Sequence, residues 1–328
     1  MSKPPVKKPE IGDKSEAILA ERKAPGRTIG IVVMCAMILF VAIWMERQAP
    51  QIDGQQMADF TMNDSEVIGF RRDAWFLPDD DLSGFVRIPA GSFTMGSNPA
   101  LDRLAYENER WSSARRQGSV DLADYYIGRF EVTTAQFKAF LQDVPTQAVP
   151  LERDQAGNNP VANITWPEAL AYTRWLEQKL KSSAQTPAEI KQFLDEGAHV
   201  TLPSEAEWEK AARGIDARVF PWGSQVRPDL ANYESSAVVA VGSVPCDECA
   251  YGLADMSGNV WELTRSPLQD YPYDPADDAD SLSEDALWVM RGGSYADSIN
   301  NLRAAVRGGV DPGVRNNTIG FRLVISKL

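Results

Sequence analysis

Hydrophobic and polar positions alternate where the ordered part of the chain is expected to begin. Residues 85–97 (FVRIPAGSFTMGS) alternate around a Pro-Ala-Gly break, which predicts a β-hairpin. Residues 124–133 (DYYIGRFEVT) predict a further strand. Residues 133–144 (TTAQFKAFLQDV) then predict a short helix with Thr133 or Thr134 as its N-cap.

Residues 164–183 form the clearest predicted helix. Pro167 suits its first position, because the N–H that proline lacks would have no intrahelical partner there. The apolar spacing also places four side chains on one face. These are Leu170, Thr173, Leu176 and Leu180.

Two shorter helices are predicted next. Residues 186–197 have a proline at their start, Pro187, and end with Gly197. Residues 202–214 contain Ser204 and Glu207 at the spacing of a capping box, and Gly214 is the expected stop.

Helical patterns become rare after this point, and short strands such as residues 287–293 and 320–325 alternate with loops rich in Pro, Gly, Asn and Trp. We therefore predict one α+β domain over residues 84–328, with helices in its first half and irregular structure in its second. Long loops in a compact domain are uncommon, so ions, disulfides or aromatic side chains are expected to stabilise them.

The N-terminal region has a different pattern. Residues 29–45 are uninterrupted by charge, which predicts a transmembrane segment over 28–45. A cleaved signal peptide is the alternative, but the preceding polar region is long and no A-x-A-like site follows. Residues 1–27 carry seven Lys and Arg against four acids. The positive-inside rule therefore predicts a cytoplasmic tail, a signal anchor, a linker over 46–83, and a periplasmic or extracellular domain.

Composition excludes several classes of function. The net charge of −13 argues against nucleic-acid binding, which needs a basic surface. The single histidine, His199, argues against a catalytic zinc site or an iron facial triad and is expected to be structural. The C-x-x-C pair, Cys246 and Cys249, admits zinc, redox and disulfide interpretations. A local disulfide is favoured, since no second ligand pair and no βαβ context accompany it.

Eight motifs in order resemble the formylglycine-generating enzyme (sulfatase-modifying factor) family. They are IPAGSFTMGS, YYIGRFEVTTAQFKAFL, PVANITWPEALAYTRWL, LPSEAEWEKAARG, PWG, YGLADMSGNVWEL, RGGSY and GFRLV. The resemblance covers residues 84–328. It implies the family's fold, which is related to C-type lectins, rich in irregular structure and stabilised by calcium.

The resemblance also implies calcium ligands. In the SGNVWE loop they would be Ser257, Gly258, Val260 and Glu262, and backbone oxygens with one carboxylate suit Ca²⁺. A second site would use Asn232 and the Tyr233 carbonyl, although the segment that should supply its acidic partner is shorter here. The alternative for GNVWE is a plain turn in which Trp261 fills the core.

Copper chemistry is expected to be absent. Active family members hold copper through two cysteines just after the RGGSW-type motif, because paired thiolates select Cu(I). Here the first position aligns with Asp297, the second falls around residues 300–302, and no cysteine follows Cys249. The iron-dependent relatives need several histidines, so that branch is also excluded.

The leading hypothesis is therefore a pseudoenzyme, a binding or regulatory module in the cell envelope with a protein or peptide partner. Its pocket would be formed by polar and aromatic residues, with Trp222 and Trp288 nearby. They are Arg291, Ser294, Tyr295, Asp297, Asn300 and Asn301.

Two alternatives stay open. An oxidoreductase or modifying enzyme with another mechanism could use Asp297 as acid or base and the Tyr295 phenol, although an aspartate that caps a turn explains Asp297 equally well. A structural member of an envelope complex is the third hypothesis.

Overall fold

The computed structural model describes residues 80–145, 149–151, 155–281 and 286–327. The predicted cytoplasmic tail, the transmembrane segment over 28–45 and residues 46–79 of the linker lie outside these ranges. Within the described ranges, no helix is long and apolar enough to cross a bilayer.

The first sheet combines strands from both ends of the domain. Its order is β1-β4-β10-β5, and all neighbours are antiparallel. Its strands are β1 (Phe85–Ile88), β4 (Tyr125–Gly128), β10 (Val324–Ser326) and β5 (His199–Thr201). The last strand of the chain therefore lies in the middle of the sheet, which ties the C-terminal loops to the helical half.

The hairpin predicted over residues 85–97 is wrong. β2 (Gly91–Met95) pairs with β3 (Gly118–Leu122) in a separate two-stranded sheet, not with β1. The two pairs share one continuous register, from Phe85 opposite Gly128 to Met95 opposite Gly118. Pro89 lacks the N–H that a ladder needs, so one long ribbon is interrupted there instead of folding back.

The third sheet carries the C-terminal loops. Its order is β8-β7-β6-β9, with β6 and β9 parallel and the other pairs antiparallel. Its strands are β6 (Trp261–Pro267), β7 (Trp288–Arg291), β8 (Gly308–Val310) and β9 (Ile319–Gly320). Every residue of β6 is buried, so this strand forms the floor beneath the loops.

The four predicted helices are confirmed. They are α2 (Thr134–Asp143), α3 (Trp166–Ser182), α4 (Ala188–Asp195) and α5 (Glu205–Arg213). Thr133 caps α2 and Ser204 caps α5 through its capping box with Glu207. Thr165 caps α3, so Pro167 occupies the second helical position, one later than predicted. The four residues predicted to share a face of α3 are all buried.

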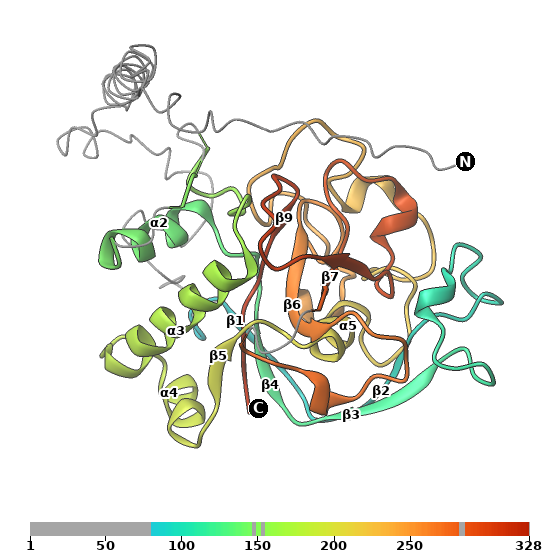
Figure 1. Ribbon diagram of the computed structural model, residues 1–328, viewed down its shortest axis with the longest axis horizontal. Helices are drawn as coiled ribbons and strands as arrows, with labels where there is room; N and C mark the ends of the chain where they lie inside the picture. Colours follow the sequence, from blue (N-terminus) through green and yellow to red (C-terminus); the bar gives the residue numbers. More distant parts are fainter. Residues whose placement is uncertain (1–79, 146–148, 152–154, 282–285, 328) are drawn as a thin grey trace, which may run out of the picture. The chain divides into compact units, whose positions relative to one another are not determined.

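The helices lie on both faces of the first sheet (Figure 1). Tyr126 of β4 belongs to the core beneath α2, α3 and α4, whereas the adjacent Tyr125 and Ile127 pack with Trp208 of α5. This alternation follows from the two-residue period of a strand. Beyond α5, the helical turns among the described residues are short 3₁₀ segments, which confirms the predicted change to irregular structure.

Candidate functional site

The RGGSY segment lies beside two other loops. Backbone hydrogen bonds join them: the Tyr295 N–H donates to the Asn259 carbonyl (2.9 Å), and the N–H groups of Ser235 and Glu234 donate to the carbonyls of Tyr295 (2.7 Å) and Asp297 (3.0 Å). We call these segments the C-terminal loop cluster: residues 232–235, 257–261 and 294–301. The cluster lies at the end of the third sheet where β6 begins, with Trp261, and where β7 ends, with Arg291.

Asp297 organises this cluster. Its Oδ2 accepts hydrogen bonds from the Trp261 indole Nε1 (2.8 Å), the Ser294 N–H (3.0 Å) and the Ser294 hydroxyl (2.5 Å). Its Oδ1 accepts from the Asn301 amide (2.6 Å). A carboxylate with four donors around it is held as an acceptor, and this geometry favours the turn-capping interpretation over a general acid or base.

Two residues predicted for the pocket, Arg291 and Ser294, are buried in the core, and so is Trp288, which was expected near the pocket. Arg291 is fully buried, where it pairs with Glu209. Ser294 is buried beneath Asp297, and Trp288 stacks on Trp166 with ring centroids 4.1 Å apart. Local sequence could not reveal this, because the partners of Arg291 and Trp288 lie on α5 and α3.

The remaining predicted residues reach the surface. Tyr295 and Asn301 are half-buried and Asn300 is exposed. The Asn301 side-chain oxygen also accepts a hydrogen bond from the Tyr106 hydroxyl (3.2 Å). Sequence reasoning missed Tyr106; the only signal was a run of apolar side chains at 101, 104 and 106 within a polar segment.

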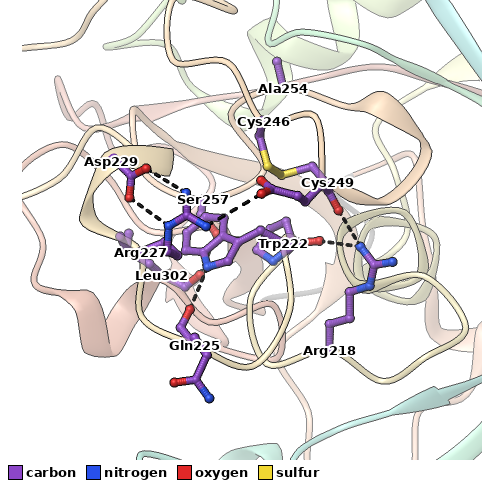
Figure 2. The surroundings of a disulfide bond; sticks show 12 residues. Arg218, Trp222, Gln225, Arg227, Asp229, Cys246, Cys249, Ala254, Ser257 and Leu302 are labelled. Carbon is purple, nitrogen blue, oxygen red and sulfur yellow. Dashed lines mark hydrogen bonds and ion pairs between the residues drawn. A yellow bond between two sulfur atoms is a disulfide. The ribbon is translucent and has the colours of Figure 1, made fainter.

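Cys246 and Cys249 form a disulfide whose neighbours include residues of the cluster. Figure 2 shows the disulfide with Ser257 and Leu302 nearby, and the Ser257 hydroxyl donates to the Leu302 carbonyl (2.6 Å). Trp222 lies in the same region and donates its indole N–H to a backbone carbonyl (2.8 Å). The disulfide loop itself is contacted by Arg218, which donates to the Glu248 carbonyl (2.7 Å), and by Arg227, which pairs with the Glu248 carboxylate.

The predicted calcium ligands lie close together, but the side chains of Glu262 and Ser257 already form hydrogen bonds within the protein. The Glu262 carboxylate is buried and accepts two hydrogen bonds from the Arg322 guanidinium and one from the Trp208 indole (2.6 Å). The Ser257 hydroxyl is a donor, as described above. A calcium ion here would share Glu262 with Arg322 and would depend on the backbone carbonyls of Gly258 and Val260. Asn232, from the second predicted site, forms a bridge with Gly258, so the two sites would adjoin.

Two further carboxyl groups, those of Glu131 and Asp255, lie near this loop and feel the charge of Arg322. Glu131 accepts from the Asn259 amide through Oε1 (3.1 Å), and its buried Oε2 has no hydrogen-bond partner. Burial, together with the nearby charges of Asp255 and Glu262, raises the pKa of Glu131. Burial also raises the pKa of Asp255 to about 6. Two oxygen-rich side chains beside a carbonyl loop fit a hard cation, although no group of three His, Cys, Asp or Glu side chains in the described ranges is arranged to hold a metal.

The fold is shared with solved structures. PvdO from Pseudomonas aeruginosa matches with a TM-score of 0.60 at 24% identity, and the match covers 74% of this chain and 94% of that one. Treponema denticola variable protein 1 matches with a TM-score of 0.54 at 26% identity, again over 74% of this chain and 94% of that chain. The architecture is therefore one of mixed helices and small sheets with long ordered loops.

Residues 76–327 match the model of the sulfatase-modifying factor enzyme 1-like domain, so the chain belongs to the formylglycine-generating-enzyme (sulfatase-modifying factor) family. Hercynine oxygenase of Mycolicibacterium smegmatis is 30% identical over 285 residues, which cover 73% of this chain and 60% of that protein. The inactive Cα-formylglycine-generating enzyme 2 of Bos taurus is 31% identical over 182 residues, which cover 50% of this chain and 49% of the relative.

Proposed function

We propose that this protein is a membrane-anchored binding or regulatory module whose sulfatase-modifying factor domain lies outside the cytoplasm and lacks copper-dependent cysteine oxidase activity. The observation that carries the proposal is Asp297. It occupies the position where the resemblance to active members expects a thiolate, and its two oxygens are engaged by Trp261, Ser294 and Asn301.

The chemistry of the donor set supports this proposal. Cu(I) requires soft ligands, and a carboxylate is a hard one. The 328 residues contain three cysteines. Cys35 lies in the predicted transmembrane segment, and Cys246 and Cys249 are joined to each other. No pair of free thiols is therefore available beside the loop cluster in these residues.

The relatives point to more than one use of the domain. One is named as an oxygenase and another as an inactive enzyme. A third, serine/threonine-protein kinase Pkn1 of Chlamydia trachomatis, is 28% identical over 280 residues, which make up only 38% of that protein. A similar domain within a longer protein that is named as a kinase supports a regulatory role.

Copper binding and oxidation test the negative half of the proposal. The full chain is loaded with Cu(I), and its metal content is measured before a cysteine-containing peptide and O₂ are added. We expect no stoichiometric copper and no formylglycine product by mass spectrometry. One tightly bound copper per chain, or conversion of the peptide, would contradict the proposal.

Site-specific photocrosslinking tests the positive half. Benzoylphenylalanine is placed at Asn300, which is exposed in the loop cluster, and, as a control, at Ala188 of α4, which is exposed on the helical half. In intact cells we expect a discrete crosslinked product from position 300 and none from position 188. Equal labelling at both positions, or at neither, would count against a binding site in the cluster.

Anchoring and calcium are separate parts of the proposal. Carbonate extraction should leave the full chain in the membrane pellet and release a chain that lacks residues 1–45.

Calcium should raise the midpoint of thermal unfolding relative to EGTA, whereas magnesium should not, since Mg²⁺ demands a stricter octahedral geometry. A relation of the fold to C-type lectins stays a prediction.

A further inference from the structure

An arm between β2 and β3 lies beside the C-terminal loop cluster. We call residues 98–117 the β2–β3 arm; in Figure 1 it is the teal segment that extends beyond these two strands. Side-chain turns shape its backbone: Asn98 accepts from the Ala100 N–H (3.0 Å) and Asp102 accepts from the Leu104 N–H (3.0 Å). The arm is therefore an ordered loop with a defined local conformation.

A buried arginine just after the cluster holds the arm in place. The guanidinium of Arg303, which is fully buried, donates to Asp102 (2.6 Å) and to both oxygens of Glu109 (2.8 and 2.7 Å). It also lies 5.0 Å from the Tyr106 ring centroid, and the Tyr106 hydroxyl reaches Asn301. These contacts hold the two ends of the exposed part of the arm in place.

The arm presents apolar side chains to solvent. Leu101 is 71% exposed, Leu104 38% and Tyr106 43%. Three large apolar side chains are therefore exposed within six residues, on a backbone that the buried Arg303 holds in place. Such preorganisation lowers the entropic cost of association.

The same surface is locally basic on an acidic protein. Arg303 pairs with both Asp102 and Glu109 and offsets one of these two negative charges, and Glu107 is the exposed acid of the arm. Against it stand Arg103, Arg110, Arg115 and Arg116, of which Arg110 and Arg116 pair with Glu107. The net charge of the whole chain is −13. A positive, apolar surface on such a protein complements a negative, apolar ligand.

We infer that the β2–β3 arm docks an acidic segment of a partner protein that carries apolar side chains, next to the polar groups of Asn300 and Asn301. The inference rests on the proposed binding function and names the chemistry of the partner. Leu101 and Leu104 contribute apolar contact, Arg103 and Arg115 contribute charge, and the adjoining asparagines offer hydrogen bonds to a peptide backbone.

A lipid surface is the rival occupant, since arginines with leucines also suit anionic headgroups. A protein segment is favoured because the arm connects through the Tyr106 hydroxyl to the side-chain amide of Asn301 in the loop cluster. This amide suits a peptide backbone, which alternates donors and acceptors.

The test is peptide display against the full chain in nanodiscs of zwitterionic lipid. We expect the selected peptides to be enriched in Asp and Glu combined with Leu, Phe or Trp. Their affinity should fall at least about tenfold with Leu101→Ser/Leu104→Ser, and several-fold with Arg103→Gln/Arg115→Gln or on raising salt. The control Ile215→Ser/Val314→Ser alters two exposed apolar residues outside the arm and should bind as the wild type does.

Three results would overturn the inference. Selected peptides that bind the Leu101→Ser/Leu104→Ser protein unchanged would place the ligand elsewhere. Binding of phosphatidylglycerol vesicles that the same double substitution abolishes, with no peptide enrichment, would assign the arm to lipid. A synthetic peptide of residues 59–70 of this chain, which is acidic and apolar, would indicate an intramolecular occupant if it bound the arm and displaced the selected peptides.

These results are distinguishable from failure of the proposed function. Peptides that ignore the arm but are lost with Asn300→Ala/Tyr295→Ala would refute the arm and leave a binding module intact. Oxidation of a cysteine peptide would refute the proposed function whatever the arm binds.

Discussion

The helical half and the loop-rich half of the domain are stabilised in different ways. Under α2, α3 and α4, the core is an aromatic cluster in which, for example, the rings of Phe137 and Tyr172 stack with centroids 5.6 Å apart. Around α5 and the C-terminal loops, buried arginines pair with buried carboxylates. They are Arg213, Arg265, Arg291, Arg303, Arg307 and Arg322.

This difference predicts different responses to mutation. Apolar packing loses stability in proportion to the volume removed, and the remaining side chains can partly adjust. A buried ion pair behaves otherwise, because removal of one partner leaves an uncompensated charge in the interior. The loop-rich half should therefore tolerate replacement of both partners of a buried ion pair better than replacement of one partner alone.

Arg322→Met should have the largest effect. It leaves the Glu262 carboxylate, which is fully buried, without its bidentate partner, so the free energy of unfolding in urea should fall by about 3–5 kcal/mol. Adding Glu262→Gln should recover part of the loss. The exposed pair Arg227–Asp229 is the control, and Arg227→Met should cause no measurable change.

Leu176→Ala tests the other half. Leu176 is 2% exposed on α3, and loss of its side chain should cost about 2–4 kcal/mol, mostly through the cavity it leaves. The conservative Leu176→Met should cost much less, since the volume is nearly kept. If Leu176→Ala lowered the free energy of unfolding more than Arg322→Met, the proposed difference in how the two halves are stabilised would be wrong.

Sequence predicted the helical half well because its signals are local. The Ser204–Glu207 capping box, the cap before α2 and the single buried face of α3 are each set by residues a few positions apart. The predicted hairpin was wrong because strand partners are not local, and β2 finds its partner more than twenty residues later.

The candidate site was predicted in part for the same reason. The motif RGGSY identified the segment, but an arginine in a sequence does not reveal its carboxylate. Arg291 was therefore expected at a pocket and is instead buried against Glu209 of α5. Tyr106 and the β2–β3 arm were missed because their link to Asn301 crosses 195 positions of sequence.

The variant Asp297→Ala tests whether Asp297 stabilises the loop cluster. It removes the acceptor of the Trp261, Ser294 and Asn301 donors and should lower the free energy of unfolding by about 1–3 kcal/mol. Asp297→Asn keeps an acceptor oxygen and should cost less. A catalytic aspartate without a structural role would leave stability unchanged in both variants.

The smallest expected effect is on the pH dependence of the free energy of unfolding, and it is specific to the loop-rich half. Asp278 is buried, and burial raises the pKa of its carboxyl to about 6 although Arg265 opposes this. The pKa of Asp278 is near 3.8 in the unfolded chain and about 6 in the folded one, so between these pH values only the folded state holds the proton. The free energy of unfolding should therefore rise as the pH falls from 7.5 to 5. The same contribution is lost as the pH rises through 6. Asp278→Asn should reduce this slope.

Asp143 on α2 is the matched control. Its hydrogen bond with Lys179 lowers the pKa of Asp143, so the stability it contributes is lost only as pH falls below the unfolded value near 3.8. Asp143→Asn should therefore leave the slope of unfolding free energy between pH 7.5 and 5 unchanged. The two carboxylates would then differ in their response to mild acidification: Asp278 contributes stability as the pH falls because its charge is buried, and Asp143 does not. Equal slopes for Asp278→Asn and the wild type would show that Arg265 offsets the cost of burying that carboxylate.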